Sequence, residues 1–362
     1  MSLTEAEIRA HLATFIDPHL DIDIIASGAL RSLAIAGANV ALELRLGYPA
    51  AIYAGLMQEQ LQAHVLSYPG VQHAQVEVRW AVQAHKVQGE LSPLPNIKNI
   101  IAVASGKGGV GKSTTAVNLA LALHAEGATV GILDADIYGP SQVMMLGISG
   151  RAASTDDGYS LQPKSNYGVE MMSMGLMAGE DTPMVLRGPM VTKAMMEMLT
   201  QTNWSKLDYL IIDLPPGTGD IQLTLAQRVP VSGAVIVTTP QNIALLDAQR
   251  ALKMFEKVGV PVLGVVENMA THICGNCGHE DAIFGAGGGA KMSENYAIPL
   301  LGQLPLDRHI REQADSGMPT VVAAPDSELA QRYRMVARRA AARLSQQARN
   351  KNIAFPKIVI HE

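Results

Sequence analysis

The stretch that decides the fold runs from residue 99 to residue 115 and reads Asn-Ile-Ile-Ala-Val-Ala-Ser-Gly-Lys-Gly-Gly-Val-Gly-Lys-Ser-Thr-Thr. Residues 100–104 form a short apolar run rich in branched side chains, which predicts a buried strand. A glycine-rich turn follows, and after Lys112 the apolar residues recur with helical spacing. Strand, glycine loop and helix in this order predict a phosphate-binding loop, and residues 106–113 match G-x-x-x-x-G-K-[ST] in full.

The residues of this loop have separate expected roles in holding ATP. Its backbone N–H groups can turn inward because glycine has no Cβ, and the following helix points its positive end at the same place. Lys112 is expected to reach the β- and γ-phosphates, and the Ser113 hydroxyl to bind Mg²⁺. The nucleotide-binding residues predicted in the loop are Gly106, Lys107, Gly108, Gly109, Val110, Gly111, Lys112, Ser113 and Thr114.

The composition of the chain is typical of a soluble globular protein and argues against a nucleic-acid-binding or membrane-spanning one. The chain has 362 residues, enough for two domains, and is 48% hydrophobic and 17% charged, as is ordinary for a soluble globular protein. A net charge of −5 argues against broad nucleic-acid binding. The chain begins with an acidic amphipathic segment, and it has no apolar run of membrane-spanning length. The two cysteines lie close together and make no disulfide framework, which favours a cytoplasmic location. From the charge and the lack of a long apolar run we expect no nucleic-acid or membrane partner.

The chain divides into four predicted parts. Residues 1–90 predict a small α+β domain, with a helix capped by Thr4 and Glu7, a hairpin at 30–46, a helix at 50–66 and a strand at 71–80. Residues 91–97 contain two prolines and are the expected linker. Residues 98–345 predict an α/β ATPase domain, a mostly parallel sheet of the P-loop type with helices on both faces, and 346–362 a C-terminal tail.

Carboxylates follow two of the predicted core strands. Residues 130–133 lead into Asp134-Ala135-Asp136, and residues 207–212 lead into Asp213. Because the carboxyl ends of parallel strands meet at the ligand-binding edge, these side chains should lie beside the phosphate loop. Asp136 is predicted to activate the attacking water, with Asp134 supporting it or a Mg²⁺-bound water, although the two roles could be exchanged. Asp213 is in the position that holds Mg²⁺ directly or through water, and the Gly217 N–H is placed to sense the γ-phosphate.

Three segments resemble one known family. Gly-Lys-Gly-Gly-Val-Gly-Lys-Ser-Thr, with its early lysine Lys107, resembles the deviant Walker A loop of MinD, ParA, the nitrogenase iron protein and the Mrp/ApbC proteins. The octet at 213–220, Asp-Leu-Pro-Pro-Gly-Thr-Gly-Asp, is similar to the Mrp/ApbC form. Residues 1–90 resemble the iron–sulfur-assembly domain often fused ahead of such ATPases, through an Asp-Pro turn at 17–18 and the order of elements.

This resemblance carries several expectations. It implies a slow ATPase and a face-to-face homodimer, in which Lys107 crosses to the nucleotide of the opposing subunit. It also implies that Asn268 reads the adenine edge, and that Pro305 and Asp307 lie in a loop on the base side. The positive charge of Lys107, Lys112 and Mg²⁺ would counter the charge that develops on the γ-phosphate.

The only cysteines, Cys274 and Cys277, form a C-x-x-C turn, which can hold a metal from one side. Iron–sulfur clusters and structural zinc usually need four ligands, and two such turns would meet in a face-to-face dimer. The family resemblance implies a shared [4Fe–4S] cluster that is received from donor proteins and passed to apo iron–sulfur proteins. Zinc is the alternative, because Cys-Gly-Asn-Cys-Gly-His looks like half of a zinc knuckle and His279 could be a ligand. Spacing alone does not separate the two.

The sequence therefore favours an ATP-hydrolysing carrier of iron–sulfur clusters, against three alternatives. A MinD- or ParA-like positioning ATPase would need a membrane or DNA surface and no C-x-x-C turn. A reductase like the nitrogenase iron protein would keep its cluster and cycle its redox state. A zinc-stabilised P-loop ATPase would hold zinc at the two cysteines.

Overall fold

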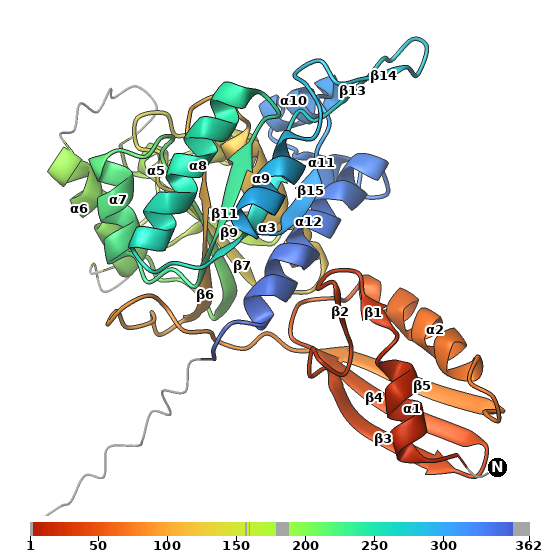
Figure 1. Ribbon diagram of the computed structural model, residues 1–362. Helices are drawn as coiled ribbons and strands as arrows, with labels where there is room; N and C mark the ends of the chain where they lie inside the picture. Colours follow the sequence, from red (N-terminus) through yellow and green to blue (C-terminus); the bar gives the residue numbers. More distant parts are fainter. Residues whose placement is uncertain (1–2, 156–157, 159, 179–187, 350–362) are drawn as a thin grey trace, which may run out of the picture.

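The computed structural model describes residues 3–155, 158, 160–178 and 188–349, so most of the predicted C-terminal tail lies outside the described residues. Figure 1 shows a smaller N-terminal domain, coloured red to orange, beside a larger domain in which helices surround a sheet. Among the described residues, no helix is both long and apolar enough to cross a bilayer.

The small domain packs two helices on a three-stranded sheet. It contains α1 (Glu5–Leu12), β1 (Ile16–Asp17), β2 (Ile22–Asp23), β3 (Leu30–Ala36), β4 (Asn39–Leu46), α2 (Tyr53–Leu66) and β5 (His73–Trp80). Thr4 and Glu7 form the predicted capping box, and β3 and β4 form the predicted antiparallel hairpin. Strand β5 adds parallel to β4 on its other side. Along β4, Val40, Leu42, Leu44 and Leu46 are buried, which is the period-two pattern of a sheet covered on one face.

The large domain is built on an eight-stranded sheet with the order β15-β12-β11-β6-β10-β7-β9-β8. All neighbours in it pair in parallel except β8 and β9, which confirms the predicted mostly parallel architecture. Its strands are β6 (Ile97–Ala104), β7 (Val130–Asp134), β8 (Lys164–Asn166), β9 (Val169–Ser173), β10 (Leu207–Asp213), β11 (Gly233–Thr238), β12 (Val262–Glu267) and β15 (Leu300–Gln303).

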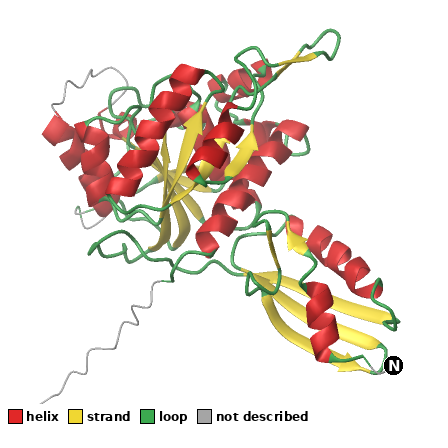
Figure 2. Cartoon of the chain, viewed as in Figure 1, coloured by secondary structure: helices red, strands yellow, loops and turns green. Residues whose placement is uncertain are grey.

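Helices cover both faces of this sheet, as predicted (Figure 2). They are α3 (Lys112–Ala125), α4 (Gln142–Met145), α5 (Met174–Ala178), α6 (Gly188–Gln201), α7 (Asp220–Arg228), α8 (Asn242–Lys257), α9 (Gly288–Tyr296), α10 (Arg308–Asp315), α11 (Thr320–Ala323) and α12 (Glu328–Ser345). The strands are apolar on both sides: Ile101 packs in the core formed with α3 and α12, whereas its neighbour Ile100 packs in the core that contains α6 and α7. A hairpin of β13 (His272–Ile273) and β14 (Glu280–Asp281) projects beyond the helices (Figure 1).

The small domain attaches where α3 ends and α12 passes it. Glu126, at the C-terminal end of α3, is fully buried. Its carboxylate accepts hydrogen bonds from Arg338 of α12 at 2.6 and 2.8 Å and from the backbone N–H of Ile52 at 3.0 Å. The helix that begins at the phosphate loop is therefore bonded at its other end to both the small domain and α12.

Candidate functional site

The phosphate loop connects the central strand β6 to α3. Gly109 and Gly111 have φ angles of +81° and +84°, a conformation that side-chain-bearing residues rarely adopt. Gly106 is required for a different reason, since a Cβ there would lie 2.1 Å from the backbone of Asp247 in α8. Glycine thus fixes both the shape of the loop and the close approach of α8 to it.

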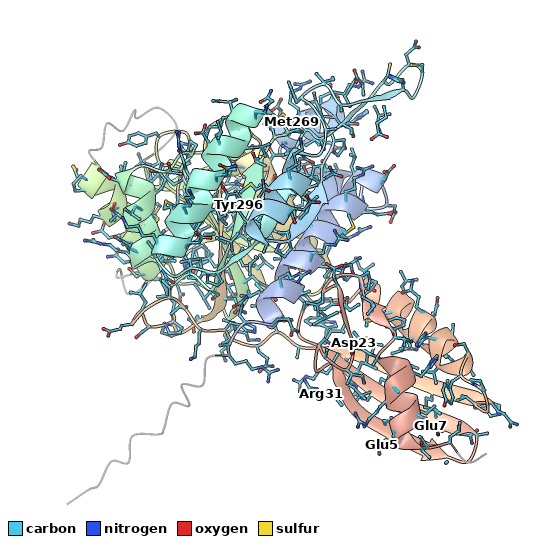
Figure 3. All side chains as sticks on the ribbon, viewed as in Figure 1. Glu5, Glu7, Asp23, Arg31, Met269 and Tyr296 are labelled. Carbon is cyan, nitrogen blue, oxygen red and sulfur yellow. The ribbon has the colours of Figure 1, made fainter. Side chains whose placement is uncertain are left out.

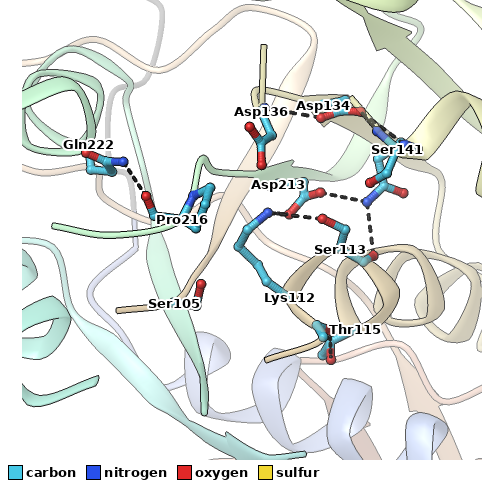
Figure 4. A network of polar contacts seen from close by, with 12 residues as sticks. Ser105, Lys112, Ser113, Thr115, Asp134, Asp136, Ser141, Asp213, Pro216 and Gln222 are labelled. Carbon is cyan, nitrogen blue, oxygen red and sulfur yellow. Dashed lines mark hydrogen bonds and ion pairs between the residues drawn. The ribbon is translucent and has the colours of Figure 1, made fainter. Parts of the chain in front are cut away.

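Two charged side chains predicted from separate segments meet beneath the loop. Lys112 is 6% exposed, and its Nζ lies 2.5 Å from Oδ1 of Asp213 and 3.1 Å from the hydroxyl of Ser113 (Figure 4). Asp213 ends β10 and is paired in register with Asp134 of the neighbouring strand β7. The parallel register thus brings the acidic strand ends to the lysine and hydroxyl that were expected to bind phosphate and Mg²⁺.

Gln142, at the start of α4, is a site residue that sequence reasoning missed. It is fully buried, and its Nε2 donates to Oδ2 of Asp213 at 2.8 Å and to the Ser113 carbonyl at 3.0 Å. Its Oε1 has no hydrogen-bond partner within the described chain. The only signal in the sequence was its place directly after Tyr-Gly-Pro-Ser, downstream of the Asp-Ala-Asp turn.

The two aspartates of that turn occupy different surroundings. Asp134 is fully buried, and its carboxylate accepts backbone N–H groups of Ser141 at 2.9 Å, Gln142 at 3.0 Å and Asp136 at 3.2 Å. Burial and the charge of Asp213 raise the pKa of Asp134 to about 7. Asp136 is half-buried and lines the cavity beside the phosphate loop, and burial also raises its pKa. Asp134 therefore holds the loop that follows it, while Asp136 faces the space where a substrate would lie.

This cavity has a volume of about 330 Å³. It is lined by Ser105, Lys107, Gly108, Gly109, Gly111, Lys112, Ser113, Thr114, Asp136, Ser141, Met145, Pro216 and Met269. Most of the predicted loop residues are thus brought together with Asp136. Met269 is an addition, and Figure 3 places it at the base of the projecting β13–β14 hairpin.

The residues predicted for the adenine side, Asn268, Pro305 and Asp307, are not among those that line this cavity. The Asn268 Nδ2 donates to the carbonyl of Val110 at 2.9 Å, so this amide supports the phosphate loop. Pro305 and Asp307 do not line the cavity, and Asp307 caps α10 by accepting the His309 N–H at 2.7 Å. Their loop runs alongside the segment after Asn268, with backbone hydrogen bonds between the two.

Two further predicted residues have distinct contacts. Gly217 has a φ angle of +101°, and its N–H donates to the carbonyl of Ser105 at 2.9 Å. Lys107 lines the cavity and is half-buried, and its ammonium makes no ion pair with any part of the chain that the structure covers. Gly217 therefore links the segment after β10 to the residue before the phosphate loop through a backbone hydrogen bond. Lys107 places at the cavity a cation that no carboxylate of the described chain neutralises.

The two cysteines lie in the turn of the projecting hairpin. The N–H of Cys274 donates to the His279 carbonyl at 2.8 Å, and the N–H of Gly278 donates to the Cys274 carbonyl at 2.9 Å, which closes the turn. Hydrogen bonds from backbone N–H groups, first that of Asn276 and then that of Cys277, lower the pKa of the Cys274 thiol. Cys277 is exposed and both thiols are free. Within the described ranges, no group of three or more His, Cys, Asp or Glu side chains is placed to hold one metal ion.

Two family models match separate parts of the chain. A family model described as the NUBPL iron-transfer P-loop NTPase matches residues 96–341, and one described as an iron–sulfur cluster assembly protein matches residues 5–78. An iron–sulfur cluster carrier protein of Pseudomonas fragi is 58% identical over 278 residues, 76% of this chain and 97% of its own. A protein of the same name from Salmonella typhimurium is 49% identical over 339 residues, 94% of this chain and 92% of its own. A solved nucleotide-binding protein of Archaeoglobus fulgidus, in complex with ADP, has 37% identity and a TM-score of 0.57 over 65% of this chain and 91% of its own.

Proposed function

This chain belongs to the family of iron–sulfur cluster carrier P-loop NTPases, and from that premise we propose that two copies hold one [4Fe–4S] cluster between them in the cytoplasm and pass it to apoproteins under the control of ATP. The observation that carries the proposal is the cysteine hairpin. It presents two thiols on a projecting turn, with backbone N–H groups that favour the thiolate of Cys274, and its base lies against the nucleotide cavity.

A second copy supplies what one chain lacks. A cluster of this type is usually held by four thiolates, and one chain offers two. Because the hairpin projects from its own domain, a two-fold axis can place the thiolate pair of one subunit opposite the identical pair of the other. The same pairing of subunits would bring Lys107, whose ammonium has no ion-pair partner in the described chain, to the nucleotide of the partner subunit.

The nucleotide half of the proposal assigns roles to the groups beneath the loop. Mg²⁺ and ATP fit a site with a hydroxyl, a carboxylate and a lysine on a glycine loop, so Ser113 and Asp213 would hold the metal and Lys112 the β- and γ-phosphates. Bound Mg²⁺ would draw charge from the transferring phosphoryl group. Lys112 would then exchange its bond with Asp213 for bonds with phosphate. Asp136 would accept a hydrogen bond from the attacking water, because its carboxylate faces the cavity while that of Asp134 binds backbone.

Gly217 links the nucleotide to the rest of the molecule in this proposal. Its N–H is bonded to the Ser105 carbonyl, so contact with a γ-phosphate would break that bond and move the segment after β10. Pro216, the residue before it, and Met269, at the base of the cysteine hairpin, line the same cavity. A nucleotide-dependent shift of these walls would change the separation of the two cysteine pairs and gate release of the cluster.

The test is anaerobic reconstitution with iron and sulfide, followed by metal analysis, measurement of molecular mass and transfer to an apo-enzyme. The expected result is four irons per dimer, an estimate that follows from the proposed cluster type, and activation of the apo-enzyme. A variant with Cys274→Ser and Cys277→Ser should bind no cluster yet keep its affinity for Mg·ADP. A strictly monomeric cluster-loaded protein, or zinc at the cysteines after anaerobic purification, would refute the proposal.

The two aspartates are separated by their asparagine variants. Asp136→Asn should lose ATP turnover while nucleotide affinity and unfolding stability stay close to those of the wild type. Asp134→Asn should lower stability, because one amide cannot accept three backbone N–H groups as a carboxylate does. Normal turnover in Asp136→Asn would contradict the assignment.

A further inference from the structure

A second cavity lies at the junction of the two domains, away from the phosphate loop. Its volume is about 260 Å³. One wall comes from the end of β1 and the turn after it, the turn before β3, and β3 and β4 with the residues that follow β4. Another comes from the segment after β5, and the third from the C-terminal end of α12 and the residues after it. The cavity thus joins the small domain to the helix that packs against α3.

Three arginines line this cavity: Arg31, Arg45 and Arg349. Figure 3 labels Arg31 at the end of the small domain that is nearest the ATPase domain. Each of the three is exposed, and within the described ranges none takes part in an ion pair, whereas other exposed arginines of the small domain, such as Arg79 beside Glu77, do. Three cations from separate segments therefore share one cavity, and none of them is paired with a carboxylate of the described chain.

Within the described residues one carboxylate lines the cavity, and it does not neutralise the three arginines. Asp17 is 1% exposed, and its two oxygens accept the Tyr48 hydroxyl and the His19 N–H, each at 2.8 Å. Burial raises the pKa of Asp17, because the charged carboxylate is less stable away from water. The nearby Asp21 is paired with Arg343 at 2.6 Å, and Asp23 accepts backbone N–H groups of its own turn. Three guanidinium groups against one engaged carboxylate leave an excess of positive charge.

We propose that this cavity binds a small anion that carries two or more negative charges on carboxylate or phosphate groups. Guanidinium groups present planar pairs of N–H donors that match both groups, and several converging ones hold a polyanion more tightly than a single charge. Gln83 and Gln346 also line the cavity, and the Gln346 amide nitrogen donates to the Ser27 carbonyl at 3.4 Å. An anion bound there would bridge the small domain and the end of α12, so its binding would stabilise their docking. This inference is independent of the proposed cluster transfer.

The experiment is calorimetric titration of the full-length protein at constant ionic strength with tricarballylate, a tricarboxylate, and separately with inorganic phosphate. The protein is first saturated with ADP and excess Mg²⁺, so that the phosphate loop is occupied. Binding of either anion at one site per chain supports the proposal, and the preferred probe identifies the ligand class.

The variants locate the site. Replacing both Arg31→Gln and Arg45→Gln should weaken binding at least about tenfold, the factor expected for losing a charge-assisted hydrogen bond. Arg79→Gln, in the same sheet but outside the cavity, should leave it unchanged. Because Arg31 and Arg45 are exposed, folding of the double variant should be normal, which circular dichroism checks. Absence of saturable binding at millimolar anion, or equal weakening by Arg79→Gln, would overturn the proposal.

Discussion

Replacing Glu126 by alanine is expected to loosen the attachment of the small domain to the ATPase domain. Glu126 is fully buried at the end of α3, where it binds Arg338 and the backbone N–H groups of Ile52 and Tyr53. The Arg338 side chain is only 14% exposed, so it would keep its charge in a largely buried place after its partner was removed. Breaking a buried pair in this way costs about 3–5 kcal/mol.

A matched control is available on α12. Glu328 pairs with Arg332 at 2.6 Å, the same distance as the shortest Glu126–Arg338 contact, but its side chain is 70% exposed. Solvent screens such a pair, so Glu328→Ala should cost about 0–1 kcal/mol. A double variant with Glu126→Ala and Arg338→Ala should be less destabilised than the sum of the two single variants, because no charge is left stranded.

The two tryptophans of the chain allow each domain to be followed separately. Trp80 ends β5 and lies against Gly127, beside Glu126, whereas Trp204 is buried in the large domain. Urea unfolding would be followed by fluorescence in the Trp204→Phe background, which leaves Trp80 as the reporter at the interface. A loss in Glu126→Ala of less than about 1 kcal/mol, no larger than in the exposed control, would refute the claim that this ion pair holds the domains together.

Three other predictions follow from buried or crowded groups. His19 is buried with both ring nitrogens unpartnered in the described structure, and burial together with two arginines of α12 lowers its pKa from 6.5 to about 3. Stability should therefore hold above pH 6.5 and fall by about 2 kcal/mol from pH 7.5 to pH 5, a loss that His19→Phe removes in pH-dependent urea unfolding. Gly106→Ala would press a methyl group into the backbone of α8 and should lower the nucleotide-free unfolding stability and weaken Mg·ADP binding in calorimetry. A methyl group at Gly108 meets no protein atom within 4 Å, so Gly108→Ala should leave the nucleotide-free stability close to that of the wild type. Lys112→Met should cost about 3–5 kcal/mol in nucleotide-free unfolding because it strands a buried carboxylate, while Lys107→Met should change stability by less than about 0.5 kcal/mol.

Much of the architecture could be predicted because its signals are local. The apolar run before the glycine loop, the capping box of Thr4 and Glu7, and the alternation along β4 each act within a few residues, and each element forms as expected. The helix expected at residues 50–66 begins at Tyr53, since the N–H groups of Ala51, Ile52 and Tyr53 bond to the distant Glu126. Residues far apart in the sequence decided that boundary.

The sequence by itself determined the phosphate loop, the mostly parallel sheet and the paired cysteines, because these depend on residue type and spacing along a short stretch of chain. Only the tertiary structure distinguished Asp134 from Asp136 and revealed Gln142 as the link between Asp213 and Ser113. Two aspartates two residues apart look alike in a sequence. Their surroundings differ because strands and loops from distant segments decide which carboxylate meets backbone N–H groups and which meets an open cavity.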